Sequence, residues 1–247
     1  MEGTNCEYEA FESFRRSGAD PRYVHVKELE NHDLRLSDFD IIFFPGGFSA
    51  GDYVRAGAIF AARLRAAVGQ ELRTFDDSRK PIIGVCNGFQ VMVELGMLPG
   101  GNDSGKKVTL TFNSSGRFEC RRVFVRLLSR NRMLEDAFSS RKAWEVPVAH
   151  SEGRIVLEDA ENTFNELMEE DKILFQYVDK NGNTTGYPWN PNGSYGDIAA
   201  LSNSHGNAIG LMPHPERIYY DYQAAEKIAP TSGKEFFDSV ISYSRSL

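Results

Sequence analysis

The segment with the clearest chemical signal is Pro81-Ile-Ile-Gly-Val-Cys-Asn-Gly-Phe-Gln90. An apolar run ends at Val85, and Cys86 follows it between Gly84 and Gly88. Nucleophiles of hydrolases sit in such a G-x-nucleophile-x-G pattern, at a sharp turn from a strand into a helix. Glycines avoid clashes in so tight a turn, and a helix N-terminus favours thiolate over thiol. The pattern predicts a nucleophilic Cys86, although a lone cysteine after an apolar strand is often only a small buried residue.

A thiol nucleophile needs a base and a group that orients the base. Among the five histidines the strongest candidate is His214, in Gly210-Leu-Met-Pro-His-Pro-Glu-Arg217, directly after an apolar run. Two prolines stiffen this loop, and Glu216 is close enough to hold the imidazole in one tautomer. The alternative is a surface histidine beside an unrelated glutamate.

An oxyanion-binding group completes this kind of chemistry. The Gly46-Gly47 pair follows another apolar run and can present a bare backbone N–H of Gly47. The N–H of Asn87, next to the nucleophile, is a second candidate donor. A plain tight turn is the usual meaning of Gly-Gly, so both interpretations of this loop remain open.

These groups require strands that end at one edge of a sheet. Residues 40–45 and 81–85 are continuous apolar runs, as in strands of a parallel sheet buried on both faces. Residues 58–72 between them have helical spacing, which predicts a βαβ unit, and residues 89–95 predict the helix after Cys86. Ligand sites of open α/β sheets gather at the carboxyl ends of the strands, where Cys86 and His214 would lie.

The second half of the chain is richer in β segments. Further strands are expected at 23–26, 108–112, 118–128, 173–178 and 208–212, a hairpin turn at Asn181-Gly182 and a last helix at 233–243. The fold class predicted is α/β, with a mostly parallel central sheet, helices on both faces and added β segments in the second half. No linker is evident, so residues 1–247 are expected to form one domain.

Composition excludes several classes of protein. Of the 247 residues 41% are hydrophobic and 26% charged, which is average for globular proteins. A formal net charge of -7 disfavours binding to nucleic acids or anionic membranes, and no run of about 18 apolar residues could span a bilayer. The three cysteines are too few and too scattered for a disulfide framework, so a reducing, cytoplasmic location is expected. Cys120 is expected to be structural.

Taken together, these segments resemble the triad-type (class I) glutamine amidotransferases, whose fold is flavodoxin-like. Within that family the chain is most similar to glutaminase subunits of de novo purine biosynthesis. The segments that carry the resemblance are GTNCE at 3–7, FPGGFSAGDYVRAG at 44–57, GVCNGFQ at 84–90, FNSSGRFECR at 112–121, PVAHSEGR at 147–154, YPWNPNGS at 187–194 and GLMPHPER at 210–217.

The resemblance implies hydrolysis of L-glutamine to glutamate and ammonia through a glutamyl thioester on Cys86. It also implies roles for a set of residues: Cys86, His214 and Glu216 in catalysis, Gly47 and Asn87 at the oxyanion, and Gln90, His150, Ser151 and Glu152 in substrate binding. Members of the family begin with a hydrophobic strand before the segment at Gly3, and that strand is expected to lie upstream.

Partners are implied as well. The ammonia would pass to a large synthetase subunit that binds ATP, magnesium and formylglycinamide ribonucleotide, with a small bridging subunit in many organisms. This chain has no G-x-x-x-x-G-K-[ST] loop, so no nucleotide or other cofactor is expected in it. Aromatic residues at 187–189 and 219–222 are candidate docking surface.

Two other functions stay open. A cysteine elbow also occurs in peptidase-like and deglycase-like α/β proteins, although these take their partner residues from other positions. A non-catalytic regulatory subunit could keep the fold, but it would not need Cys86, His214 and Glu216 together. A metal site is weakly supported, because the histidines and cysteines lack the spacing of metal ligands.

Overall fold

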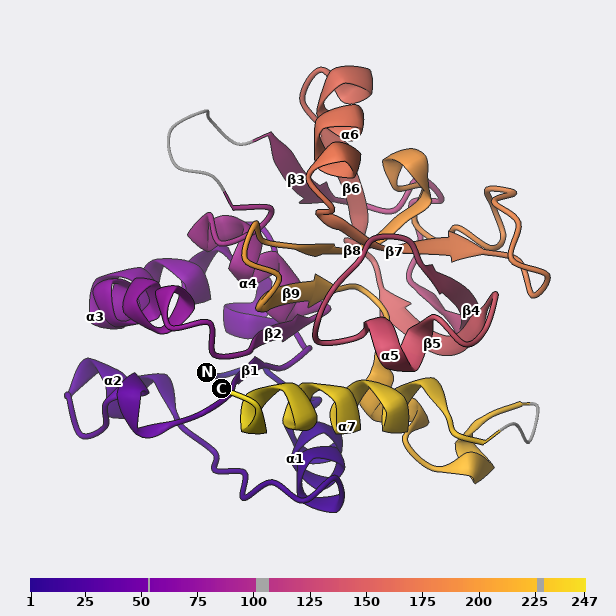
Figure 1. Ribbon diagram of the computed structural model, residues 1–247. Coiled ribbons are helices and arrows are strands. Elements are labelled where there is room, and N and C mark those ends of the chain that lie inside the picture. Colours follow the sequence, from indigo (N-terminus) through magenta and orange to yellow (C-terminus); the bar gives the residue numbers. More distant parts are fainter. Residues whose placement is uncertain (53, 101–106, 226–228) are drawn as a thin grey trace.

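A seven-stranded sheet forms the centre of the protein in a computed structural model, which describes residues 1–52, 54–100, 107–225 and 229–247 (Figure 1). The strand order is β1-β2-β9-β8-β7-β4-β5. The strands of this sheet are β1 (Ile42–Phe44), β2 (Ile82–Val85), β4 (Glu119–Leu127), β5 (Trp144–His150), β7 (Ile173–Val178), β8 (Ile198–Ser202) and β9 (Ala208–Leu211). The helices are α1 (Glu7–Arg16), α2 (Val26–Glu30), α3 (Ala58–Asp77), α4 (Asn87–Leu95), α5 (Glu135–Phe138), α6 (Ala160–Glu169) and α7 (Ser232–Arg245).

The parallel part of the sheet is β1-β2-β9. In the register Phe44 lies opposite Gly84, and Val85 lies opposite Leu211, so the three strands end at the same edge. Helix α3 connects β1 to β2 and confirms the predicted βαβ unit, although it continues to Asp77 rather than ending near residue 72. This edge is where the catalytic groups were expected.

The prediction of a mostly parallel sheet needs correction. The α/β class and the added β segments are confirmed, but the pairs β9–β8, β8–β7, β7–β4 and β4–β5 are all antiparallel. The sheet of the described residues is therefore mixed. Apolar runs such as Ile173–Val178, with five of six residues buried, look alike in parallel and antiparallel strands, so their pattern does not reveal strand direction.

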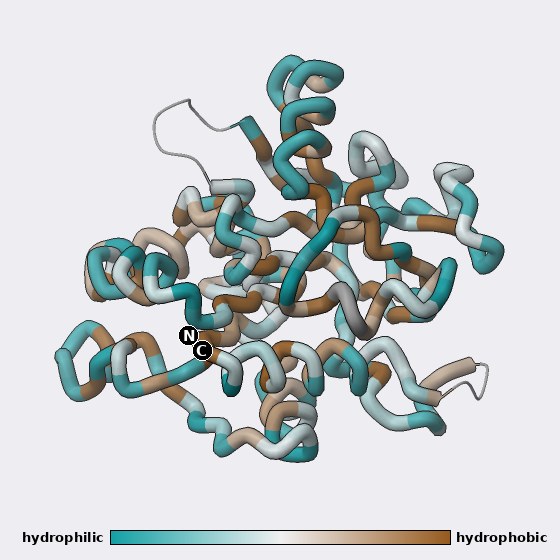
Figure 2. Tube along the Cα trace, in the orientation of Figure 1, coloured by the Kyte–Doolittle hydropathy of each residue, from teal (hydrophilic) through white to brown (hydrophobic). Residues whose placement is uncertain are grey.

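Helices cover both faces of the parallel part (Figure 1). Consecutive residues of β1 show this division. The Phe43 ring lies near Phe237 of α7 and packs edge-on against Phe14 of α1, whereas Phe44 packs against Phe60 of α3. Figure 2 shows hydrophobic residues concentrated in the central strands and hydrophilic ones along α6. The core therefore lies on both sides of β1, β2 and β9.

Two local predictions failed. Residues 23–26 do not form a strand, because His25 caps α2 in a capping box with Glu28 and Val26 begins the helix. The Asn181-Gly182 turn forms, with the Gly182 N–H donating to Asp179 O at 3.0 Å, but it does not directly join two paired strands. A turn in which the Gly206 N–H donates to Asn203 O at 3.0 Å does join a pair, the antiparallel strands β8 and β9.

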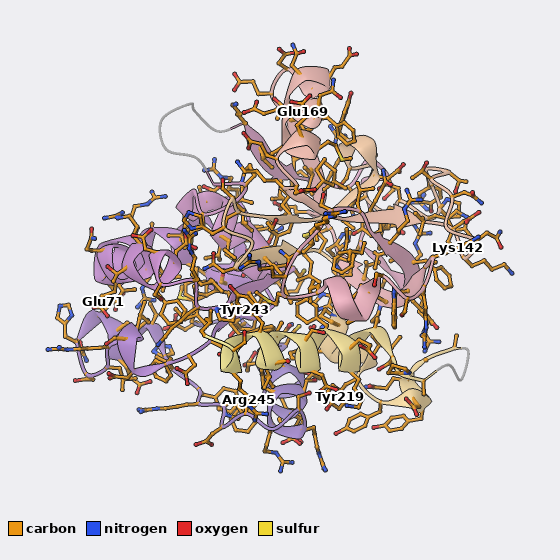
Figure 3. The ribbon with its side chains drawn as sticks, in the orientation of Figure 1. Glu71, Lys142, Glu169, Tyr219, Tyr243 and Arg245 are labelled. Atoms are coloured by element: carbon orange, nitrogen blue, oxygen red, sulfur yellow. The ribbon has the colours of Figure 1, made fainter. Side chains whose placement is uncertain are left out.

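A smaller unit projects from the sheet. Strands β3 (Val108–Thr111) and β6 (Arg154–Leu157) pair with each other, and α6 follows β6 (Figure 1). The side chains of Glu169 at the end of α6 and of Lys142 lie at the outside of the molecule in Figure 3. No helix in the described ranges is long and apolar enough to cross a membrane.

The outer edge of β1 has no neighbouring strand among the described residues. Beside it lies an apolar groove whose lining includes Phe14, Phe43, Phe60 and Leu64. The first strand expected upstream of Gly3 stays a prediction.

The candidate docking aromatics are only partly exposed. Tyr219 lies beside α7 in Figure 3, is 7% exposed, and its hydroxyl is 3.0 Å from that of Ser17. It is therefore a core residue and not docking surface. Trp189 packs against Phe124, while Tyr187 is exposed. Cys120, expected to be structural, is exposed on β4.

Candidate active site

The nucleophile elbow has the predicted geometry. Cys86 follows β2 directly, with a left-handed φ of 52°, and α4 begins at Asn87. A Cβ at Gly88 would lie 2.0 Å from Phe44 O, and one at Gly84 would lie 2.6 Å from Gly88 O. Glycine is therefore required at both positions, and Cys86 has the strained backbone typical of functional sites. The Cys86 N–H donates to Leu211 O at 2.8 Å, which ties the elbow to β9.

His214 comes from the end of β9, the strand next to β2. Its Nδ1 lies 2.5 Å from Glu216 Oε1, and the two residues are 1% and 2% exposed. Burial opposes a charged imidazole, but attraction to Glu216 and to Cys86 outweighs it, so the pKa of His214 is raised well above its usual range. The structure thus brings together all three predicted catalytic residues, with His214 positioned by Glu216.

The glycine loop approaches the catalytic residues closely. A Cβ at Gly46 would lie 2.9 Å from His214 Cε1 and 3.4 Å from Cys86 Cβ, so only glycine leaves room for the imidazole. Two backbone hydrogen bonds hold the loop, because the Asn5 N–H donates to Gly46 O and the Phe48 N–H donates to Gly3 O. Neither bond uses the N–H of Gly47. Gly47 and Cys86 line the same pocket. This placement fits the predicted oxyanion role of Gly47.

Asn87 also connects the elbow to this loop through its side chain. Its Oδ1 accepts from Ser49 N–H at 3.2 Å, and its Nδ2 donates to Gln90 Oε1 at 3.0 Å. The Gln90 amide in turn donates to Glu152 O. These contacts link the loop after β1, helix α4 and the segment after β5.

The pocket that contains these groups has a volume of about 80 Å³. The four residues that the resemblance assigned to substrate binding all line it, namely Gln90, His150, Ser151 and Glu152. Cys86 Sγ lies 3.7 Å from Ala149 O of β5. The backbone N–H of His214 donates to Pro147 O of the same strand at 2.8 Å. Strand β5 therefore forms the wall opposite the elbow and carries His150 at its end.

The pocket residues that were not identified from the sequence include three with reactive or charged side chains, Cys6, Asp52 and Arg217. Cys6 is buried, and its sulfur lies 2.9 Å from Arg217 Nη2 and near His214. The pKa of Asp52 is raised by burial and by the nearby carboxylate of Glu152. All three lie in segments that carry the resemblance, namely Cys6 in GTNCE, Asp52 in FPGGFSAGDYVRAG and Arg217 in GLMPHPER, but their types and spacing alone gave no sign of a role in the site.

Donor atoms of Cys6, His214 and Glu216 lie within 4.8 Å of one another, a spacing that a metal ion could use. Glu216 already holds the Nδ1 atom of His214, and the Arg217 guanidinium supplies a positive charge beside Cys6. A cation would be repelled by this guanidinium, so we assign no metal to these atoms.

Comparison with known proteins agrees with this geometry. Residues 1–244 match the model of the CobB/CobQ-like glutamine amidotransferase domain. Phosphoribosylformylglycinamidine synthase subunit PurQ of Picrophilus torridus is 52% identical over 223 residues, which cover 90% of this chain and 86% of that protein. The subunit PurQ of Archaeoglobus fulgidus is 40% identical over 256 residues, covering 98% and 94% respectively.

A solved structure is also similar. A chain in the structure of PurLQS from Thermotoga maritima has a TM-score of 0.74 at 32% identity, with 98% of this chain and 94% of that chain covered. The resemblance inferred from the sequence is thus confirmed. This chain belongs to the CobB/CobQ-like glutamine amidotransferase family.

Proposed function

We propose that this chain is the glutaminase subunit of a phosphoribosylformylglycinamidine synthase. The observation that carries the proposal is the buried arrangement of Cys86, His214 and Glu216 at the ends of two parallel strands, with His214 Nδ1 2.5 Å from Glu216. The PurQ subunits that are similar to this chain over most of its length support the assignment to purine biosynthesis.

The reaction follows from these positions. His214 takes the proton of the Cys86 thiol, the sulfur attacks the side-chain carboxamide carbon of L-glutamine, and the oxyanion accepts from the N–H groups of Gly47 and Asn87. His214 gives a proton to the nitrogen, the C–N bond breaks, and ammonia leaves a glutamyl thioester on Cys86. Water then attacks the thioester while His214 takes its proton, and glutamate leaves as the C–S bond breaks.

Ammonia is proposed to pass to a synthetase subunit that binds ATP, magnesium and formylglycinamide ribonucleotide, in a cytoplasmic complex. The PurLQS structure, one chain of which is similar to this chain, supports a complex with other subunits. The amidation would take place in the synthetase subunit. No cofactor is assigned to this chain.

The test is release of ammonia from L-glutamine by wild type and Cys86→Ala. Each is measured alone and with the cognate synthetase, its nucleotide ligands and, where the organism has one, the small subunit. Activity in the wild-type complex that is lost in Cys86→Ala supports the proposal. If neither protein releases ammonia in the complete complex, the result contradicts the proposal and favours a regulatory subunit. Turnover of a peptide or a glycated amine without turnover of L-glutamine favours the peptidase-like or deglycase-like alternative.

A further inference from the structure

The second buried histidine of the pocket has an atom that the proposed reaction does not use. His150, at the end of β5, is 3% exposed and lines the pocket with Cys86 and His214. Its Nδ1 lies 3.1 Å from Asn113 Oδ1. Its Nε2 is buried and has no hydrogen-bond partner among the described residues. An unpaired buried polar atom is costly, so its presence on a residue that lines the pocket needs an explanation.

The hydrogen bonds of Asn113 fix the tautomer of this histidine. The Asn113 amide nitrogen donates to Arg117 O at 2.9 Å and to His150 O at 2.8 Å, and its Oδ1 accepts from Gly153 N–H at 3.2 Å. Because Oδ1 can only accept, the proton of His150 is on Nδ1. Its Nε2 therefore carries a lone pair and acts as an acceptor.

The ring has little freedom to turn away. A Cβ at Gly153 would lie 2.7 Å from Nδ1 and Cε1 of His150, so the imidazole packs directly against the backbone at Gly153. Burial and the nearby charge of His214 lower the pKa of His150 to about 3. The ring is thus neutral at physiological pH, and Nε2 remains an acceptor there.

The surroundings of His150 indicate which donor it meets. The Cys86 sulfur lies against the carbonyl oxygen of Ala149, the residue before His150. The backbone N–H of His214 donates a hydrogen bond to Pro147 O on the same strand. A substrate carbonyl carbon in contact with this sulfur brings its leaving group close to the end of β5. A carboxamide presents N–H donors there, whereas an ester presents an oxygen with no hydrogen.

We propose that His150 Nε2 accepts a hydrogen bond from the carboxamide N–H of the substrate, and then from the departing ammonia, so that His150 selects amides over esters. This inference rests on the proposed glutaminase function. A site built to bond an N–H group discriminates strongly against an analogue that lacks it, because the acceptor is left unpaired.

The experiment compares kcat/KM for L-glutamine and for L-glutamate γ-methyl ester, with glutamate as the product measured in both cases. It uses the complete complex and the variants His150→Phe and His150→Gln, with the exposed His205→Gln as a matched control. We expect His150→Phe to lose about 10- to 100-fold for L-glutamine and less than about 3-fold for the ester. His150→Gln keeps an acceptor oxygen and should recover part of the loss.

Equal losses for both substrates in His150→Phe would mean that the ring only supports the fold, which overturns the inference. Unchanged turnover of L-glutamine would overturn it too. Ester turnover by the variant shows that the protein is folded and that Cys86 is competent. Failure of the proposed function looks different, because then wild type itself releases no ammonia from L-glutamine.

Discussion

The two walls of the pocket each hold a buried histidine, and the pKa values of the two histidines are shifted in opposite directions. His214, on the wall built by the parallel strands β2 and β9, has its Nδ1 at a carboxylate, and its pKa is raised. His150, on the wall built by the antiparallel strand β5, has its Nδ1 at the Asn113 amide, and its pKa is lowered to about 3. Burial is nearly the same at 1% and 3% exposure. The difference therefore comes from the neighbouring groups, because attraction to Glu216 and to Cys86 raises the pKa of His214, whereas the charges of His214 and Arg121 lower the pKa of His150.

This contrast separates two chemical tasks. Proton transfer to the leaving ammonia needs an imidazole that can be charged, and Glu216 stabilises that form. Recognition of an N–H group needs an acceptor that stays neutral, and Asn113 provides it without adding charge. One side chain could not do both tasks at the same pH.

The largest effect is expected from Glu216→Gln, which removes the difference between the two histidines by giving His214 an amide partner like that of His150. The attraction to Glu216, the larger of the two attractions that raise the pKa of His214, is lost while burial remains, so its pKa falls. We expect kcat/KM for L-glutamine to drop by about 10³- to 10⁴-fold, as when the carboxylate of a comparable triad is replaced by an amide. The alkaline limb of the pH–rate profile, where the imidazolium loses its proton, should move to lower pH. Steady-state kinetics from pH 6 to 10 would show both effects.

Glu158→Gln, an exposed change of the same type after β6, serves as the control and should leave the profile in place. An unshifted alkaline limb in Glu216→Gln would mean that Glu216 does not set the charge of His214.

The pH dependence of the free energy of unfolding tests the lowered pKa of His150, on the other wall of the pocket. The folded pKa of His150, about 3, lies below its unfolded value near 6.5, so between these values the unfolded chain binds one more proton. Stability is therefore lost as pH falls below about 6.5, by about 1.4 kcal/mol per pH unit from this group. From pH 6 to pH 4 wild type should lose roughly 2 to 3 kcal/mol more than His150→Gln.

Urea unfolding of both proteins at several pH values measures this difference. His205→Gln removes an exposed histidine and should follow wild type. Parallel curves for wild type and His150→Gln would contradict the neutral state of His150.

How far the sequence predicts the site depends on how local each part is. Cys86 and its two glycines were found because strand, turn and helix are contiguous, and His214 and Glu216 because they are two residues apart. Asn113, by contrast, reaches His150 across 37 residues of sequence, and the pairing of β4 with β5 brings their loops together. Such contacts depend on topology, which periodicity does not give.

The fold shows the same limit. The βαβ unit and helix α7 were predicted because spacing and length identify them. Strands β5 and β8 were not predicted at all, and the directions of β4 and β7 were not predicted because an apolar run looks the same in parallel and antiparallel strands. At Val26 a capping interaction outweighed an alternating pattern, a competition that the pattern alone does not decide.

The smallest effect expected tests whether the two thiols near His214 are equivalent. Cys6 is buried beside the imidazole, but it has neither the strained φ of Cys86 nor a strand that presents it, and its sulfur accepts from Arg217. Cys6→Ser keeps an acceptor for the guanidinium, so we expect kcat/KM for L-glutamine to fall less than about 10-fold, or about 1.4 kcal/mol. A glutamine-analogue electrophile should then label one cysteine, Cys86, in both wild type and Cys6→Ser, as read by peptide mass spectrometry. Label on Cys6, or loss of activity as deep as in Cys86→Ala, would show that the elbow is not what distinguishes the nucleophile in this pocket.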